Sequence, residues 1–252
     1  MRLAVWPVLP ARALARALGD LVTDIVEVEP FEARAALDEG RADLALVPTL
    51  DILRAHAGLE VIPDVALVGE RSPRRRLVVG SALDAIETIA FDPRDAQEAL
   101  LMQLVLREHY GAHPTFELPQ ADALADVLDH QSAALVGYGD ALPEGTFALD
   151  PAREWVDLTL RPYVWGLLAA PEGVLDLLAV RRLRDAVLEA PVSEDLFADG
   201  VGAYQLTLDG YAFDGLDQIG EYLFQTGTLT EVPAVPFVHL PDDDEDPDDE
   251  DA

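Results

Sequence analysis

The sequence predicts an α/β protein with two lobes, each built on an open doubly wound sheet. Three observations predict this fold. Short apolar runs of β type alternate with helical periods, residues 2–47 follow the order strand, helix, strand, helix, strand, and a second such unit begins near residue 77. Parallel strands joined through a helix cross over with a right hand, so each unit is expected to form half of an open sheet.

The first unit contains three strands and two helices. Its last strand is a continuous apolar run, which is typical of a parallel strand covered on both faces. Gly40 follows the second helix, where a left-handed C-terminal cap is expected. The expected strands are Arg2 to Val8, Asp24 to Glu29 and Leu44 to Val47, and the expected helices are Ala11 to Leu21 and Phe31 to Glu39.

The second unit is less regular. A long helix ends before Gly111 and Pro114. Residues 163–170 form a strongly apolar run, and helix-rich sequence is expected after it, to about residue 228. The expected elements are the strands Leu77 to Val79, Thr88 to Phe91, Thr115 to Leu118 and Ala133 to Val136, with helices at Ala96 to Tyr110 and residues 121–130. We place the first lobe at residues 1–75 plus 163–240, the second at 76–162, and an acidic tail at 241–252.

The composition is strongly acidic, with 48 Asp and Glu against 17 basic residues and a formal net charge of -31. Nucleic acids and anionic membranes favour a basic surface, so neither is expected as a partner. All 17 basic residues are Arg, and Lys, Cys and Asn are absent. Lysine Schiff bases, thiol nucleophiles, disulfides and thiolate metal sites are therefore excluded. The acidic excess suggests adaptation to high salt, and Asp242 to Asp251 reads as a disordered solvating tail.

The N-terminal segment lacks the pattern of a signal peptide, because a basic region followed by an apolar core and a cleavage site is missing. No window of eighteen residues is apolar and free of charge, so no membrane span is expected. We expect a cytoplasmic protein. No pattern in the sequence indicates its oligomeric state.

A ligand is expected outside the carboxyl ends of the strands, where the two lobes face each other across a cleft. The segments that end strands are Leu9 to Arg12, Pro48 and Thr49, Asp92 to Arg94, and Gly137 to Asp140. The one dense basic patch, Arg71, Arg74, Arg75 and Arg76, enters the second lobe nearby. It could draw in a carboxylate ligand, which Arg binds with bidentate geometry, or it could be solvated and paired with surface carboxylates.

Several of these segments share order and spacing with a known family. Residues 30–54, PFEARAALDEGRADLALVPTLDILR, combine a helix, Gly-x-x-Asp, an apolar run and Pro-Thr, and similar stretches lie at residues 8–14, 86–116, 133–142, 153–170 and 215–229. Over about residues 1–230 the chain resembles the chorismate dehydratases of menaquinone biosynthesis, which have the type II periplasmic-binding-protein fold. The resemblance implies removal of water from chorismate to give 3-enolpyruvoyl-benzoate, the first step of the futalosine route, with no cofactor or metal.

The chain also departs from this family. Pro10 stands where the family has Asn, Arg76 follows Arg75 where the family has Ser, and residues 92–95 replace a loop rich in Ser and Thr. Proline offers no donor, so the contact made by that Asn cannot form in the same way. A second hypothesis is therefore a non-catalytic binding protein or sensor for a small carboxylate metabolite. A related enzyme acting later in the same pathway is a third.

The candidate substrate-binding residues each have an alternative role. Arg75 or Arg76 is the leading ligand contact. Arg94 lies before a helix, where an anion is favoured, but Asp95 and Glu98 could cap that helix instead. Thr49 after Pro48 could donate to a carboxylate or cap a helix, and Gly139 permits close backbone approach or forms a plain turn. Asp140 is the candidate general base if it is desolvated, and otherwise caps a turn.

Two further groups remain open from the sequence. Arg161 could reach the cleft or pair with Asp157. His109 and His113 have a spacing that could hold a metal on a helix, but Gly111 and Pro114 make a helix through both improbable. The expected binding partner is a small anionic metabolite.

Overall fold

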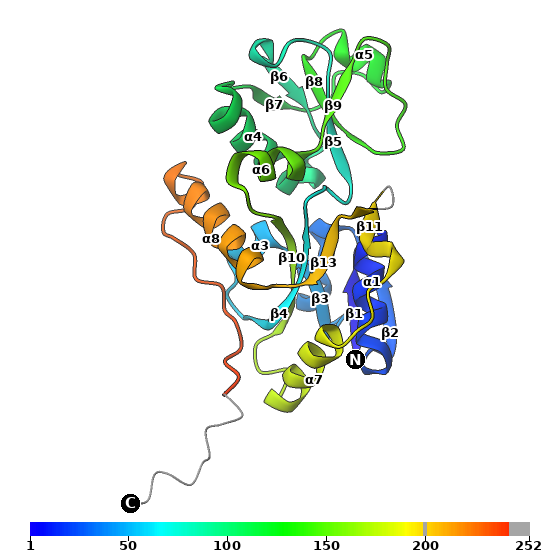
Figure 1. The fold of residues 1–252 in the computed structure, drawn as a ribbon, viewed down its shortest axis with the longest axis vertical. Coiled ribbons are helices and arrows are strands. Elements are labelled where there is room, and N and C mark those ends of the chain that lie inside the picture. The colour runs from blue at the N-terminus through cyan, green and yellow to red at the C-terminus, as the bar shows by residue number, and fades with distance from the viewer. Residues whose placement is uncertain (199–200, 242–252) are drawn as a thin grey trace, which may run out of the picture.

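The computed structural model describes residues 1–198 and 201–241, and its strands form two main sheets with helices packed against them (Figure 1). The predicted α/β architecture with two lobes is confirmed. The predicted acidic tail, from residue 242 onward, lies outside the described residues.

The larger sheet has six strands in the order β13-β4-β10-β3-β1-β2. As predicted, β1 is parallel to both β2 and β3. The other half is antiparallel, because β10 runs against β3 and β4, and β13 runs against β4. The strands are β1 (Arg2–Val5), β2 (Asp24–Glu27), β3 (Leu44–Pro48), β4 (Leu59–Gly69), β10 (Tyr163–Pro171) and β13 (Tyr204–Thr207).

The smaller sheet has five strands in the order β7-β6-β8-β5-β9. Its strands β6, β7 and β8 are parallel, and β5 is antiparallel to β8 and β9. The strands are β5 (Arg75–Val79), β6 (Thr88–Ala90), β7 (Thr115–Glu117), β8 (Ala133–Gly137) and β9 (Phe147–Leu149). A separate two-stranded ribbon consists of β11 (Phe197–Ala198) and β12 (Val201–Gly202).

The helices cover the sheets and connect the two lobes. Helix α1 packs beside α7, while α2, α3 and α8 pack against β10. Helix α4 contributes Leu104 and Val105 to the larger core and Met102 and Leu106 to the smaller one, so it belongs to both lobes. The helices are α1 (Leu9–Leu18), α2 (Ala33–Asp38), α3 (Thr49–Ala55), α4 (Ala96–Tyr110), α5 (Leu124–Leu128), α6 (Pro151–Thr159), α7 (Leu177–Leu188) and α8 (Gly210–Gln225).

Two features were not expected from the sequence. Helices α7 and α8 lie in the stretch after residue 170, as expected, but the short strands β11, β12 and β13 lie between them. Strand β4 was not expected, and Asp64 at its centre explains why. Asp64 has a left-handed conformation with φ 62°, which interrupts the alternation of inward and outward residues that identifies a strand.

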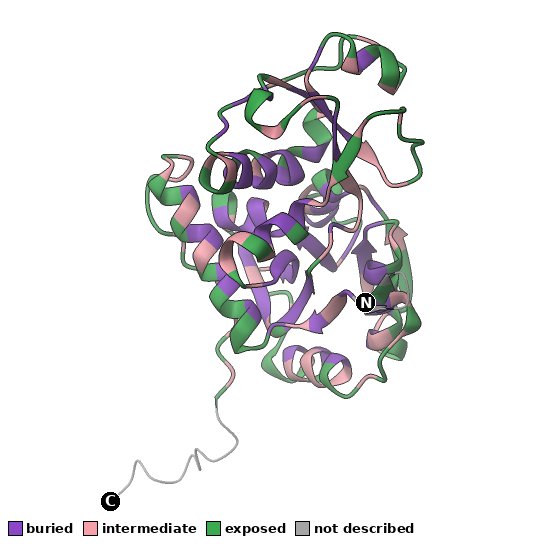
Figure 2. Ribbon diagram, turned by 45° about the horizontal axis from the view of Figure 1, so that its top comes forward, coloured by how far each residue is buried: buried purple, intermediate pink, exposed green. Residues whose placement is uncertain are grey.

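Three tryptophans anchor the larger core at the end that faces the second lobe. Trp6, Trp155 and Trp165 are at most 1% exposed. Trp6 donates from its indole to the Leu46 carbonyl at 2.8 Å. It lies so close to Gly166 that an added Cβ there would be 3.0 Å from the Trp6 ring and from the Val47 carbonyl. Burial is concentrated where α4 and α6 lie over this core, whereas the tip of the small lobe is largely exposed (Figure 2).

Candidate functional site at the cleft between the lobes

Two hollows lie where segments of both lobes meet. The larger, of about 450 Å³, combines the chain after β1, the connection between the lobes and the loop after β8, through Pro7, Leu9, Arg71, Tyr138, Phe197 and Tyr204. The smaller, of about 50 Å³, combines the ends of β1 and β3 with the start of α4, through Trp6, Pro48, Asp51, Arg94, Gln97 and Glu98. All four predicted strand-end segments therefore contribute residues to one of the two hollows.

A hollow of about 500 Å³ lies elsewhere on the large lobe, between the start of β4 and the C-terminal segment. Glu60 and Glu172 line it together with His56 and His239. Carboxylates line all three hollows, but among the described residues an arginine lines only the two in the cleft, Arg71 the larger and Arg94 the smaller, so the cleft is the better candidate for an anionic ligand.

Most of the arginines at the cleft are matched by carboxylates. The Arg74 guanidinium lies 3.1 Å from Glu29 of the large lobe and 3.2 Å from Asp95 of the small lobe. Arg75 Nε lies 2.8 Å from the other oxygen of Asp95. The Arg74 side chain is 9% exposed and that of Asp95 is 2% exposed, so this cluster is buried. It joins the two lobes and leaves Arg74 and Arg75 already neutralised.

Arg76 has a different environment. Its Nη2 donates to the backbone carbonyl of Asp140, and its Nε is buried with no hydrogen-bond partner in the described part of the chain. Its guanidinium lies over the Tyr138 ring, 5.8 Å from the ring centroid. No carboxylate within residues 1–198 and 201–241 forms an ion pair with it. Arg76 therefore keeps a positive charge that a ligand could neutralise.

The connection between the lobes is held by buried polar contacts. The Trp165 indole donates to the Arg71 carbonyl at 2.9 Å, and the Tyr204 hydroxyl donates to the Ser72 carbonyl at 3.0 Å. Asp150, at the second crossing between the lobes, accepts from Ser72 N at 2.9 Å. Asp150 also accepts from the hydroxyl of Tyr138 and caps α6 through Ala152 N. Both crossings are thereby fixed at one carboxylate.

Pro48 and Thr49 lie at the end of β3, as expected, but Thr49 does not cap α3. The capping position is Pro48, and the Thr49 hydroxyl is fully buried without a hydrogen-bond partner in the described chain. The free amide of Leu50 is instead satisfied by Gln97 Oε1 of α4 at 3.0 Å, and Gln97 Nε2 donates to the Trp165 carbonyl at 2.8 Å. Gln97 thus links α3, α4 and β10 beside the smaller hollow.

Arg94 borders the smaller hollow, but the neighbouring Asp92 carboxylate neutralises its charge. Its side chain is 64% exposed and forms an ion pair with Asp92. Hydrogen bonds from Arg94 lower the pKa of Asp92 to about 2. The alternative in which Asp95 caps α4 is wrong, since its carboxylate makes no capping hydrogen bond and binds Arg74 and Arg75.

Glu98, in the first turn of α4, borders the smaller hollow and is 4% exposed. Burial raises its pKa above the ordinary value, and the neighbouring Asp95 adds to this effect while Arg74 opposes it. The sequence suggested Glu98 only as a cap.

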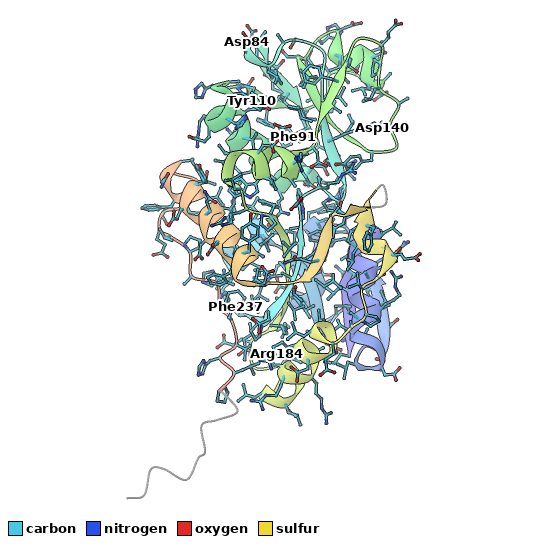
Figure 3. The ribbon with its side chains drawn as sticks, in the orientation of Figure 1. Asp84, Phe91, Tyr110, Asp140, Arg184 and Phe237 are labelled. Carbon is cyan, nitrogen blue, oxygen red and sulfur yellow. The ribbon has the colours of Figure 1, made fainter. Side chains whose placement is uncertain are left out.

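Gly139 and Asp140 are exposed on the loop after β8, where Figure 3 labels Asp140. The Asp140 carboxylate accepts from Gly137 N at 2.9 Å, which fixes the turn, and the Asp140 carbonyl accepts from Arg76. A general base at Asp140 would need desolvation, which this exposed position does not provide.

Three other residues have roles that their sequence context left open. Arg161 pairs with Asp214 at 3.3 Å rather than with Asp157, and lies over the ring of Tyr211. Helix α4 ends at Tyr110 with Gly111 in a left-handed conformation, so His109 and His113 do not share a helix. Across the described residues no group of three His, Cys, Asp or Glu could hold a metal, and no helix is long and apolar enough to cross a membrane.

Pro10 is buried in the first turn of α1 and borders the larger hollow. Proline fits this position because the first helical turn leaves backbone amides without intrahelical partners. Asp150 and Gln97 were not predicted, and Tyr138 was not singled out within the predicted segment Gly137 to Asp140. A Tyr directly after a strand that points to the cleft was the available signal for Tyr138, whereas the roles of Asp150 and Gln97 depend on contacts distant in sequence.

The fold and the arginine-lined cleft define a two-lobed protein of the periplasmic-binding-protein type. Similar solved structures include the periplasmic aliphatic sulphonate binding protein SsuA of Escherichia coli, with TM-score 0.59 and 15% identity over 96% of this chain and 92% of that one. The ligand-binding component of an ABC-type import system of Staphylococcus aureus, solved with zinc bound, has TM-score 0.60 and 13% identity over 95% of this chain and 96% of that one. Protein AF1704 of Archaeoglobus fulgidus has TM-score 0.59 and 15% identity over 90% of this chain and 98% of that one.

The sequence itself identifies the family. The model of the menaquinone biosynthesis family matches residues 1–193, and the chain belongs to that family. The resemblance stated from the sequence is thereby confirmed. No curated protein matches the chain.

Proposed function

We propose that the protein binds chorismate in the cleft between its lobes and removes water from it, giving 3-enolpyruvoyl-benzoate for the futalosine route to menaquinone. Membership of the menaquinone biosynthesis family supports the pathway. The observation that carries the choice of site is Arg76, which lies over the Tyr138 ring beside the larger hollow and has no carboxylate partner in the described chain. A cytoplasmic location is part of the same proposal.

The chemistry of this elimination suits the cleft. The carbon-hydrogen bond next to the ring hydroxyl breaks, its electron pair forms the last double bond of the aromatic ring, and the hydroxyl leaves and takes up a proton to become water. Electrons balance without an oxidant or reductant, so a cofactor is not needed. The protein must hold a carboxylate, exclude bulk water and supply a proton to the leaving oxygen.

In this proposal Arg76 anchors one substrate carboxylate, and the Tyr138 side of the larger hollow excludes water. Asp140 is exposed, so the substrate's own carboxylate is the better proton acceptor. Glu98 and Asp51 both border the smaller hollow, and burial raises the pKa of each, which favours the protonated form that can donate to a leaving hydroxyl; Glu98 is the more deeply buried of the two.

A binding protein without catalysis is the second candidate, and one observation favours it. Pro10 borders the larger hollow where the resembling enzymes have Asn. The side chain of Pro10 can neither donate nor accept a hydrogen bond. The protein would then bind a small carboxylate metabolite through Arg76 and close its lobes as a sensor.

The two candidates are separated by incubating the purified protein with chorismate in high salt and measuring the product by mass spectrometry. Loss of one water from chorismate supports the enzyme. Saturable binding without turnover contradicts the enzyme and supports the sensor.

The same assay tests the anchor. Arg76→Ala should weaken chorismate binding about 10-fold or more, because it removes a charge-assisted contact. Arg71→Ala should have a smaller effect, because Arg71 lies 3.6 Å from Asp150 and its charge is already matched. Equal effects, or a larger effect of Arg71→Ala, would contradict the assignment of Arg76.

A further inference from the structure

One stretch of the chain contacts both crossings between the lobes. The first crossing runs from the end of β4 to the start of β5, at residues 70–74, and the second, at residues 150–162, contains α6. Strand β13 pairs with the end of β4, and only two residues separate β13 from α8 (Figure 1). The stretch at residues 204–215, from β13 into α8, therefore lies beside both connections.

Tyr204 of β13 holds the first crossing. Its hydroxyl donates to the Ser72 carbonyl at 3.0 Å. An added Cβ on Gly69 would lie 2.6 Å from the Tyr204 ring, so the ring packs directly on the backbone where β4 ends. Burial raises the pKa of Tyr204, and the Asp150 carboxylate adds to this effect, so the hydroxyl stays protonated and donates at neutral pH.

Tyr211, at the start of α8, holds the second crossing in the same way. Its hydroxyl donates to the Leu160 carbonyl. Arg161 lies over the Tyr211 ring, 4.7 Å from its centroid, and Arg161 Nε lies 3.3 Å from the Asp214 carboxylate. The first turn of α8 is thereby joined to two successive residues of the crossing.

The backbone of the second crossing is strained where Tyr211 holds it. Leu160 ends α6 in a left-handed conformation, with φ 58° and ψ 28°, which is usual at a helix end for Gly and unfavourable for Leu. Its side chain is 68% exposed, so packing of the leucine does not explain this conformation. Strained backbone persists where surrounding contacts hold it. Helix α8 supplies such contacts, and it lies so close that an added Cβ on Gly215 would be 2.4 Å from the Pro162 carbonyl.

The two tyrosines also border a common hollow of about 120 Å³. Glu70 of the first crossing and Pro162 of the second line it together with Tyr204 and Tyr211. The space beside the two hydroxyl contacts is therefore not filled by other side chains, which leaves room for the crossings to shift when those contacts are lost.

We infer that residues 204–215 form a clamp on the hinge: Tyr204 fixes the first crossing, Tyr211 fixes the second, and together they restrain rotation of the small lobe against the large one. Proteins with two lobes open and close by such rotation, with hinge residues that absorb the change in backbone conformation. Because both tyrosines belong to one short stretch, a rotation that changes the spacing of the crossings breaks one of the hydroxyl contacts. The inference goes beyond the proposed function, since it applies equally to an enzyme and to a sensor.

The experiment measures the distance between the lobes in solution without ligand. The chain has no Cys, so spin labels attach only to introduced cysteines. Asp20→Cys on the large lobe and Asp84→Cys on the small lobe are suitable, because both side chains are exposed (Figure 3 labels Asp84). Pulsed dipolar electron spin resonance should give one narrow distance distribution for this labelled protein.

Tyr204→Phe and Tyr211→Phe each remove one hydroxyl and keep the ring. Loss of one hydrogen bond should raise the ratio of released to clamped molecules about 5-fold, and loss of both about 25-fold. The protein with both substitutions should therefore show a broader distribution or a second distance. Gly215→Ala should act in the same direction, because its methyl group pushes α8 away from Pro162.

Tyr222→Phe is the matched control. Tyr222 also lies on α8, with its ring 5.8 Å from that of Trp155, but in the described part of the chain its hydroxyl bonds to neither crossing. An unchanged distribution after both tyrosine substitutions would overturn the inference, as would an equal change caused by Tyr222→Phe. A change caused by Asp95→Asn but not by the tyrosine substitutions would also overturn it, since the ion pairs of the cleft would then restrain the lobes. Chorismate is absent from the measurement, so the result is independent of turnover.

Discussion

Asp95 should be a main electrostatic support of the contact between the lobes, and Asp95→Asn tests this. The substitution keeps the size of the side chain and removes its charge. Arg74 retains Glu29 at 3.1 Å, but Arg75 loses the carboxylate that lies 2.8 Å from its Nε. Removing one partner of a buried ion pair lowers the free energy of unfolding by about 3–5 kcal/mol. Because Arg74 keeps its contact with Glu29, we expect a loss of about 3 kcal/mol for Asp95→Asn.

The measurement is thermal unfolding of the wild-type and variant proteins at neutral pH. For a chain of this size about 3 kcal/mol corresponds to a Tm lower by roughly 6–12 °C. Asp92→Asn is the control, because it breaks an ion pair with the exposed Arg94 and should cost less than about 1 kcal/mol. Equal Tm changes for the two variants, or a change below about 2 °C for Asp95→Asn, would refute the assignment of Asp95.

Three further results are expected. Chorismate should raise the Tm of Asp95→Asn more than that of the wild-type protein, since the variant frees positive charge on Arg75; an equal rise would contradict this. Glu98→Gln should raise the Tm at pH 7 and have no effect near pH 4. The folded-state pKa of Glu98 is raised, so its contribution is fully present below the unfolded pKa of about 4.3 and is lost as the pH rises. A pH-independent difference would show that ionisation is not the cause. Gly166→Ala should cost about 1–3 kcal/mol in urea unfolding, because its Cβ would lie 3.0 Å from Trp6. A cost below about 0.5 kcal/mol would mean that the ring moves aside.

Local pattern was sufficient for the parts of the fold that depend on neighbours in sequence. The apolar run of β3 and the glycine after α2, which has φ 66° in the structure, could be identified because burial and backbone conformation are written into single segments. Strand β4 could not be identified, because Asp64 has a left-handed conformation that interrupts the alternation of inward and outward residues. The antiparallel half of the large sheet depends on pairings between residues 94 to 142 positions apart in the sequence.

The candidate site shows the same division. Strand ends predicted where Pro48 would lie, because parallel sheets place their carboxyl ends together, whereas Arg76 was proposed from the basic patch that enters the second lobe. The sequence did not show which arginine keeps a free charge, since that depends on where carboxylates from other segments fall. Asp95 neutralises Arg74 and Arg75 from the start of α4, and Asp92 neutralises Arg94, while Arg76 meets a backbone carbonyl and an aromatic ring.

A carboxylate of chorismate should bind between the lobes beside Arg76. The most direct test is a crystal structure of the protein with chorismate or its dehydrated product. We expect a substrate carboxylate within hydrogen-bond distance of the Arg76 guanidinium. A ligand bound at Arg94 alone, or in the hollow beside His56 and His239 on the large lobe, would contradict the account.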